Sequence, residues 1–579
     1  MATNTVSGSL ITRNYREFRG VDFSNRKDEV SIYRSPDALN MWKNYKNNNG
    51  RCVETRPDVE LLDEYSDTIH GLFFYTVNGV TQRIVHSADK LYNGSKVIYT
   101  GLSNKKTNFF VFNNKLYIKD GLRYFEYDGT SAKEVEGFIP TTTISRTPAG
   151  GGTKYQDVNL LTGLRKNSFL GDGTSKEYVL DVESFDSDYI PKVWINGKEV
   201  TSGFTVNASG GKIIFTEAPS MPLTVGQDNV VIQFRRTVEG YRARIDECTL
   251  LEVFDNRVFF SGNPNYPNFV WHCSLDDPTY CSDLDYYAEG TTDSAVKSLV
   301  AGNNALWVMK EPSSSNTTIF YHNPTIDSDY GKVYPSTHSS ISTGCVSTGI
   351  NFNDDICFFS ERGMEAISGD VTTEQVLAHR STLVDNRLLN LTGYRNLILK
   401  EWEGYLLVIL DRKMFLADSR EMVTVNDHNE YEWFYWEFDK DIKCTQVKDG
   451  VLYLCTDEEV KENGVAVIKH RIYTLTKADT NITSYWTTLD DEFKYAQYMK
   501  TTNKKGCTVD MEGDKVTVYA KAKDENFDLI QTYTNVKGYI VPRIKKKKWK
   551  SIQLKFSSDR PFRLYSATLE AYVGSYLKR

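Results

Sequence analysis

The stretch DNRVFFSG (residues 255–262) joins a polar two-residue turn to a short run of β-favouring residues. The same unit recurs with its turn at 303, 353, 403 and 449, so that successive copies begin about 50 residues apart. A period of this length is typical of a propeller blade built from four antiparallel strands. The repeat therefore predicts an all-β chain whose central part is a β-propeller.

Two earlier turns, at 78–79 and 113–114, extend the pattern toward the N-terminus. The interval from 113 to 255 is too long for one blade unless a separate module is inserted there. A Gly-rich break and several short strand-like runs mark residues 150–240 as that module, and Asn196-Gly197 within it is a strong hairpin signal. Taking this module out restores about one period. We expect a small inserted β-sandwich and six or seven blades.

The chain divides on these signals into five segments. Residues 1–60 form an N-terminal docking segment, 61–149 the first blades, 150–240 the inserted sandwich, and 241–480 the remaining blades. Residues 481–579 read as strands of alternating polarity. They form either a C-terminal β-rich domain or strands that close the propeller.

Composition limits the possible partners. Of the 579 residues, 13% are aromatic, which suits pleated, half-buried surfaces. The net charge of -7 argues against a chain that as a whole binds nucleic acid or anionic lipid. No apolar run is long enough to span a membrane, and the first residues lack a signal-peptide pattern. The nine cysteines are scattered without a CxxC pair, which favours reduced thiols over a zinc site or a disulfide framework.

A propeller raises the question of glycosidase chemistry, which needs two carboxylates facing each other with one pKa raised. The evident acidic residues, Asp255, Asp354, Glu403 and Asp449, all occupy the recurring turns. Turn chemistry explains residues that recur at the same place in each unit, because Asp and Asn tolerate left-handed backbone. We therefore predict no catalytic residue, and expect that the chain is not an enzyme.

Three further motifs resemble binding sites but are better explained as turns or surface. GDGTSK (171–176) lacks the glycine and lysine spacing of a P-loop. DVESFDSD (181–188) lacks the glycine and terminal glutamate of an EF-hand, although a weak calcium site is the alternative. SDYGKVY (328–334) occurs once and has Tyr where the sialidase turn has Trp. We predict neither a cofactor nor a bound metal.

The run RIKKKKWK (543–550) is the one concentrated basic feature. Lys545, Lys546, Lys547 and Lys548 can contact phosphates or an acidic partner, or they can be the solvated edge of a strand whose lysines prevent edge-to-edge pairing. The alternation of apolar residues around them favours the strand edge. We keep the four lysines as a possible contact patch.

Near the N-terminus, RSPDALNMW (34–42) has the features of a helix start. Ser35 can cap a helix, and Pro36 has the backbone angle of a first helical residue. Leu39, Met41 and Trp42 would give one face of this short helix something to bury. We expect a docked element.

The quoted segments together resemble the tail stabilisation or nozzle proteins that close the short tails of podoviruses. The likeness extends over most of the chain, and the stretches that carry it are FRGVDFSN (18–25), RSPDALNMWKNY (34–45), GRCVETRPDVELL (50–62), residues 246–311, the inserted SFLGDGTSKEYVLD (168–181) and VWINGKEVTSGFTV (193–206), SYWTTLDDEF (484–493) and KSIQLKFSS (550–558).

The resemblance implies a structural virion protein, assembled in the host cytoplasm as a homo-hexameric ring in the distal tail. Double-stranded DNA would pass through its lumen without specific binding, and the adaptor, needle, plug or fibre proteins of the tail would be its partners. Pro36, Leu39, Met41 and Trp42 would then be assembly contacts, because aromatic anchors dominate interfaces. The alternative function is a propeller that binds a receptor or carbohydrate on the host surface.

Overall fold

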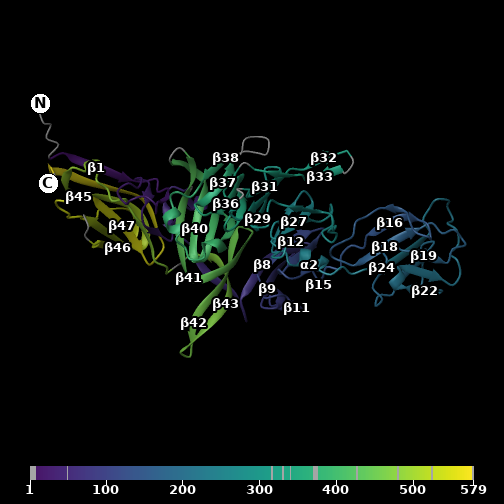
Figure 1. Ribbon diagram of the computed structural model, residues 1–579. Helices are drawn as coiled ribbons and strands as arrows, with labels where there is room; N and C mark the ends of the chain where they lie inside the picture. The colour runs from purple at the N-terminus through teal and green to yellow at the C-terminus, as the bar shows by residue number, and fades with distance from the viewer. Residues whose placement is uncertain are drawn as a thin grey trace. The chain divides into compact units, whose positions relative to one another are not determined.

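The computed structural model describes residues 8–48, 50–313, 317–328, 331–339, 341–368, 376–425, 428–478, 481–522 and 526–576. Strands dominate these residues, which confirms the all-β expectation (Figure 1). The α-helices among them are single turns or little more, α1 (Tyr45–Asn48), α2 (Tyr241–Asp246) and α3 (Asp385–Leu388). None of the described helices could cross a membrane. The chain forms two compact units, residues 1–74 with 343–579, and residues 75–342.

The recurring polar turns are two-residue hairpin connections, as the sequence predicts. Both residues of each turn have positive φ, from 47° at Asn113 to 78° at Gly450. This is the backbone of a type I′ turn, whose twist matches that of the paired strands and which Asn, Asp and Gly adopt at low cost. The turns are Asn78-Gly79, Asn113-Asn114, Asp255-Asn256, Asn303-Asn304, Asn353-Asp354, Glu403-Gly404 and Asp449-Gly450.

The propeller-type blades nearest the N-terminus are four-stranded antiparallel sheets, and all their strands except the first residues of β8 fall within residues 75–342. The strands are β8 (Ile69–Val77), β9 (Val80–Ser87), β10 (Lys90–Asn93) and β11 (Lys96–Thr100); β12 (Asn108–Phe112), β13 (Lys115–Lys119), β14 (Tyr124–Tyr127) and β15 (Ala132–Glu134); β25 (Leu250–Phe254), β26 (Arg257–Ser261), β27 (Phe269–His272) and β28 (Tyr286–Ala288); and β29 (Val296–Gly302), β30 (Ala305–Lys310), β31 (Ile319–His322) and β34 (Ser336–His338). The two-stranded ribbon of β32 (Thr325–Asp327) and β33 (Gly331–Val333) leaves the last of these blades.

The expected insertion is a small sandwich of two sheets (Figure 1). Its own apolar core forms around Phe169, Tyr178 and Phe234. One sheet contains β16 (Thr141–Arg146), β17 (Thr153–Lys154), β18 (Leu164–Phe169), β20 (Lys192–Ile195), β21 (Lys198–Val200) and β24 (Val230–Arg235), and the other β19 (Glu177–Val179), β22 (Phe204–Asn207) and β23 (Lys212–Phe215). Asn196-Gly197 is the turn between β20 and β21. GDGTSK connects β18 to β19 and so links the two sheets; it is not a hairpin turn within one sheet.

The other unit contains one further separate blade and a large curled sheet. The blade is β35 (Gly349–Phe352), β36 (Asp355–Ser360), β37 (Gly363–Ser368) and β38 (Val376–His379). The strands that follow belong to a 15-stranded sheet instead, and they are β39 (Ile398–Trp402), β40 (Tyr405–Val425), β41 (His428–Lys448), β42 (Val451–Glu462) and β43 (Val465–Lys477). The turn at 449 therefore joins two long strands of one sheet.

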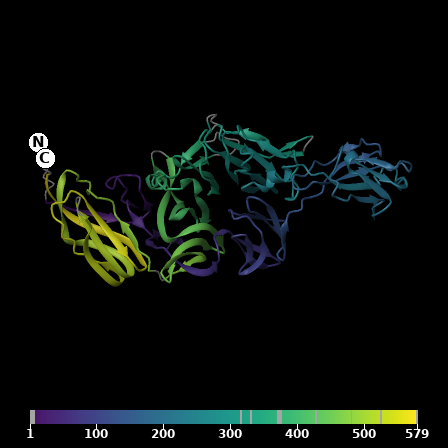
Figure 2. The same cartoon turned by 60° about the horizontal axis from the view of Figure 1, so that its bottom comes forward.

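The C-terminal strands continue the same large sheet and pair with the N-terminus. They are β44 (Ser484–Thr487), β45 (Tyr498–Ala522), β46 (Asp528–Ile540), β47 (Ile552–Ser558) and β48 (Phe562–Tyr576). Strand β1 (Leu10–Tyr15) pairs antiparallel with β48, so the first and last strands of the chain lie side by side (Figure 2). This confirms a C-terminal β-rich part.

The expected helix over residues 35–42 is wrong. This segment forms short strands instead: β3 (Arg34–Ser35) pairs with β2 (Gly20–Val21), β4 (Ala38–Leu39) pairs with β44, and β5 (Met41–Trp42) pairs with β41 and with β6 (Val53–Thr55). Ser35 does not cap a helix, because its hydroxyl donates to the Thr487 carbonyl at 2.7 Å. Pairing with strands far along the chain outweighs the local helix signals, which are worth about 1 kcal/mol each.

Asn40 sits at the centre of these pairings, in left-handed backbone with a φ of 56°. Its side-chain oxygen accepts from the Glu437 amide at 2.9 Å and from Arg56 Nε at 3.0 Å. Its side-chain nitrogen donates to the Thr483 carbonyl at 2.9 Å. One buried amide thus satisfies groups from three segments that are far apart in the sequence.

Trp42 is 4% exposed and belongs to the main apolar core of this unit. Its ring stacks on Trp402 with centroids 5.3 Å apart and meets Trp436 edge-on at 5.5 Å. Truncating Trp42 to Ala removes these contacts and leaves a cavity, so the free energy of unfolding should fall by about 3–5 kcal/mol. Denaturant unfolding followed by tryptophan fluorescence measures this change.

Tyr539→Ala is the matched control, because Tyr539 is 74% exposed. Its free energy of unfolding should stay within about 0.5 kcal/mol of the parent protein. Equal effects of the two substitutions would contradict the core position of Trp42.

Asn304 tests the turn geometry, since its φ is 58° and it ends the hairpin between β29 and β30. Asn304→Val places a β-branched side chain in left-handed backbone and should cost about 1–2 kcal/mol. Asn304→Gly should cost little, because Gly adopts this backbone freely. Thermal unfolding of the two variants separates these outcomes, and a valine variant as stable as the glycine variant would contradict the turn assignment.

Candidate functional site

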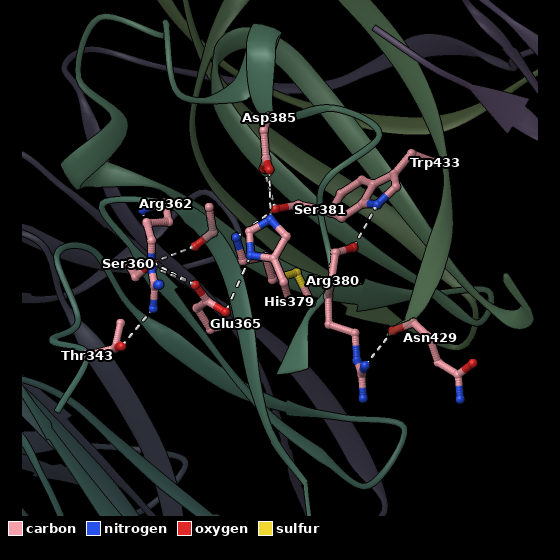
Figure 3. A network of polar contacts seen from close by, with 12 residues as sticks. Thr343, Ser360, Arg362, Glu365, His379, Arg380, Ser381, Asp385, Asn429 and Trp433 are labelled. Atoms are coloured by element: carbon pink, nitrogen blue, oxygen red, sulfur yellow. Dashed lines mark hydrogen bonds and ion pairs between the residues drawn. The ribbon is translucent and has the colours of Figure 1, made fainter. Parts of the chain in front are cut away.

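In the first unit a histidine is held between two carboxylates, within a network of polar contacts (Figure 3). His379, at the end of β38, lies with Nε2 2.7 Å from Asp385 Oδ2 and Nδ1 3.3 Å from Glu365 Oε2. Glu365 comes from β37 and Asp385 from the start of α3. We call these three residues the histidine hub.

The hub keeps its imidazole charged. Burial acts to lower the pKa of His379, but the hydrogen bonds and charges of Asp385 and Glu365 outweigh it and raise the pKa to about 10. At neutral pH the ring is therefore an imidazolium, which donates from both nitrogens and has no lone pair for a metal or a proton. The hub fixes α3 to the blade of β35–β38.

Two serine hydroxyls bind the carboxylates of the hub, and neither is hydrogen-bonded to His379 as a catalytic serine would be. Ser381 Oγ donates to Asp385 Oδ1 at 2.6 Å and accepts from the Met364 amide at 2.8 Å. Ser360 Oγ lies 3.3 Å from Glu365 Oε1. Both hydroxyls bind carboxylates rather than the imidazole, so the geometry of a Ser-His-Asp triad is not formed here.

The hub positions the residues that follow Asp385 at the wall of a cavity of about 410 Å³. We call this cavity the α3 pocket. The guanidinium of Arg387 lies 3.6 Å from the ring centroid of Phe23 and 4.8 Å from that of Tyr435. Asn386 donates from its side chain to the Phe23 carbonyl at 3.3 Å. The lining residues are Phe23, Lys27, Pro36, Asn386, Arg387, Asn390, Leu391 and Lys413.

Of the four expected assembly contacts, the structure places Met41 and Trp42 inside this chain's own core, 1% and 4% exposed. Leu39 packs against the same core. Their side chains are already in contact within the chain, so Met41 and Trp42 leave little surface for a neighbouring subunit, and the assembly role of Leu39, Met41 and Trp42 stays a prediction. Pro36 is different, because it lines the α3 pocket.

The basic run does not form a strand edge. Residues 541–547 have no regular secondary structure, and Lys548 has a φ of 52°. Ile544 and Trp549 are fully buried and hold the segment against the C-terminal strands, while Lys546 pairs with Asp528. Lys545, Lys547 and Lys548 remain exposed. The segment is thus held by the buried side chains of Ile544 and Trp549 on irregular backbone, and it is not the expected strand with one exposed face.

The other sequence motifs lie apart from the hub. Asp172 of GDGTSK accepts from the backbone amides of Thr174 and Ser175, as a turn residue does. In the acidic stretch 181–188, Arg235 binds Asp186 at 2.7 Å and also pairs with Asp188. No group of three or more His, Cys, Asp or Glu side chains among the described residues is placed to hold a metal ion. Residues 329 and 330 of SDYGKVY lie outside the described residues.

Sequence reasoning missed the histidine hub and Arg387. Glu365, His379 and Asp385 are separated by 14 and 6 residues and come from three different elements. No local motif joins them, because the blade's hairpin connections bring them together. No signal in the sequence marks these three residues, since isolated ionisable residues are common along any β-rich chain.

Comparisons with known proteins give distant matches only. No protein-family model matches the chain, and no curated protein is similar to it. Among solved structures, an exo-β-1,3-galactanase of Phanerochaete chrysosporium with β-1,3-galactotriose matches at 10% identity and a TM-score of 0.23, over 55% of this chain and 95% of that one. A glycoside hydrolase family 32 protein from Bifidobacterium adolescentis matches at 8% identity and a TM-score of 0.19, over 70% of this chain and 97% of that one.

These matches correct one expectation. The sequence led us to expect a chain that is not an enzyme, and the matching structures named above are glycoside hydrolases. That expectation is therefore contradicted and is withdrawn. TM-scores near 0.2 carry neither an activity nor a substrate over to this chain.

The pKa of His379 predicts how stability changes with pH. A folded pKa of about 10, above the ordinary value of 6.5, means that the charged ring contributes stability that is fully present below pH 6.5. This contribution decreases as the pH rises toward 10. His379→Gln should therefore cost on the order of a few kcal/mol at pH 6 and progressively less at pH 9 to 10.

Denaturant unfolding of the parent protein and of His379→Gln at pH 6, 8 and 10 measures this difference. His338→Gln is a suitable control, because His338 is exposed and lies in another blade. A cost of His379→Gln that is the same at all three pH values would show that the imidazolium does not stabilise the fold.

Proposed function

We propose that this chain is a structural protein of a bacteriophage short tail, a subunit of the nozzle ring through which the genome leaves. The proposal rests on the likeness of the N-terminal, central and C-terminal segments to tail stabilisation or nozzle proteins. Its partners are further copies of this chain, expected as a hexamer, together with neighbouring tail proteins. Its location is the virion, after assembly in the host cytoplasm.

The observation that carries the proposal is the place of the resembling N-terminal residues in the fold. Phe18, Val21 and Phe23 of FRGVDFSN are buried, and so are Met41 and Trp42 of RSPDALNMW. Residues that hold a core are constrained by the whole fold, whereas exposed residues change freely. A likeness carried by buried residues supports a shared architecture, whereas a likeness limited to exposed residues could arise by chance.

Charge is consistent with a conduit. The chain has a net charge of -7, and binding to duplex DNA by counterion release needs clustered Lys and Arg facing the duplex. In the basic run, two of the cations, Lys546 and Lys550, are paired with Asp528 and Glu492. A conduit should let its cargo pass, so weak attraction to DNA suits the proposed role.

A second candidate function, a receptor-binding propeller, is favoured by one loop of the inserted sandwich. Met221, Leu223 and Val225 are 66%, 91% and 99% exposed. The loop connects β23 to β24 and ends at Val230, the first residue of β24. Val230 pairs with Ile195, the residue that precedes the Asn196-Gly197 turn. Exposed aliphatic side chains in a loop are typical of an interaction site.

The oligomeric state of the purified chain distinguishes the two functions. Negative-stain images and mass photometry should show sixfold rings with a central pore if the chain is a nozzle subunit. Monomers or trimers that bind host cells, and lose this binding when Leu223 and Val225 are both changed to Ser, would support the receptor function instead.

A glycan-release assay on the same preparation covers the activity suggested by the names of the matching structures. Release of sugar from β-1,3-galactan that is absent from a heat-inactivated sample would replace the structural proposal with an enzymatic one.

A further inference from the structure

The α3 pocket has an unbalanced charge. Three of its eight lining residues are cations, Lys27, Arg387 and Lys413, and two are amides, Asn386 and Asn390. The remaining three, Phe23, Pro36 and Leu391, are apolar. No carboxylate is part of this lining. A cavity with net positive charge and an apolar wall favours an anionic ligand that also has an apolar part.

In two other cavities of the same unit, acidic lining residues balance all or part of the positive charge of the basic lining residues. In a cavity of about 460 Å³, Arg563 binds Glu54 at 2.8 Å and Glu512 at 3.4 Å, and all three residues line it. In a cavity of about 630 Å³, the lining residue Lys43 binds the lining residue Glu421 at 2.9 Å. The α3 pocket lacks such internal partners among its lining residues, so its charge is left for a ligand.

Arg387 is held in a defined position. It lies against the rings of Phe23 and Tyr435, and the histidine hub fixes Asp385 two residues before it. A guanidinium that is already oriented loses little entropy when a carboxylate binds. Lys27 and Lys413 are exposed and make no ion pair within the part of the chain that the structure describes, so both are able to turn toward a ligand.

Two carboxylates outside the lining come close to its residues but have other hydrogen-bond partners. Asp37 is 4.0 Å from Arg387, and it also accepts from Tyr485 at 3.1 Å. Glu437 accepts the hydroxyl hydrogen of Tyr435 and lies opposite Lys413 across β40 and β41. Both carboxylates already accept a hydrogen bond within the chain, and the three lining cations still exceed these two carboxylates by one positive charge.

We infer that the α3 pocket binds an acidic peptide segment of a partner protein. Carboxylate side chains of the segment contact Arg387, Lys27 and Lys413, and an apolar side chain contacts Phe23 and Leu391. The apolar wall and the small volume favour a peptide over duplex DNA, whose phosphates need a long row of cations. This inference stands independently of the nozzle proposal, because it depends only on the residues of the pocket.

Binding of a capped peptide of sequence EELEE to the full-length protein tests the inference. Fluorescence anisotropy of the labelled peptide should show saturable binding that weakens with salt. Lys27→Gln with Lys413→Gln should weaken this binding by at least about tenfold, because each lysine contributes a charge-assisted contact. Both lysines are exposed, so the double variant should fold like the parent protein.

The matched control is Lys545→Gln with Lys547→Gln, which removes the same charge from exposed lysines of the basic run. Its affinity for the peptide should remain within about twofold of the parent protein. Asn390→Asp adds a carboxylate to the pocket wall and should also weaken binding. It serves as a second variant if the lysine double variant fails to fold.

The same proteins are titrated with QQLQQ, inorganic phosphate and a short DNA duplex. No binding of EELEE, equal binding of QQLQQ, or loss of binding only in the basic-run variant would overturn the inference. Tighter binding of the DNA duplex that is lost with Lys27 and Lys413 would identify the pocket as a nucleic-acid site instead. Binding of phosphate alone would reduce it to a small-anion site and would also overturn the peptide assignment.

Discussion

Two very short strands, β5 and β6, join the C-terminal strands to the β40–β43 group, and the large sheet depends on them. In the strand order of this sheet, β48 pairs with β6, β6 with β5, and β5 with β41. Asn40 and the buried pair of Arg34 with Glu432, at 2.7 Å for both contacts, fix the N-terminal segment in place. Removing one partner of such a pair leaves a buried charge uncompensated, which is strongly destabilising. A segment near the start of the chain thus connects strands that are formed near its end.

The same N-terminal segment forms part of the α3 pocket. Phe23, Lys27 and Pro36 come from it, and the opposite wall comes from α3 and Lys413. The histidine hub holds α3 through Asp385, and the ring of Phe23 packs against the guanidinium of Arg387. Core formation and pocket formation therefore rely on the same residues. A change that loosens the N-terminal segment should disturb both, because Phe23 and Leu391 belong to the apolar core and also line the pocket.

The ionisable groups of this chain are used mainly to hold the fold. Carboxylates that recur with the repeat stand in turns, where left-handed backbone favours them, and His379 is kept as an imidazolium between two carboxylates. Neither arrangement resembles the pair of opposed carboxylates that glycoside hydrolysis requires. The structures that match the chain are nevertheless glycoside hydrolases, at TM-scores too low to carry an activity. Assay of the purified protein is therefore the direct way to address catalysis.

The all-β class, the inserted sandwich and the recurring two-residue turns could be predicted from the sequence, because a type I′ turn needs specific residues at adjacent positions. The sequence could not determine that residues 34–42 form strands, since β41 and β44, with which two of these short strands pair, lie hundreds of residues away. Nor could it show that the strands after Ile398 form one large sheet instead of a further blade. The histidine hub and the α3 pocket could not be predicted either, because each combines residues from separate segments of the chain. Local signals are read over a few residues, whereas strand pairing and pocket walls arise from contacts between distant segments.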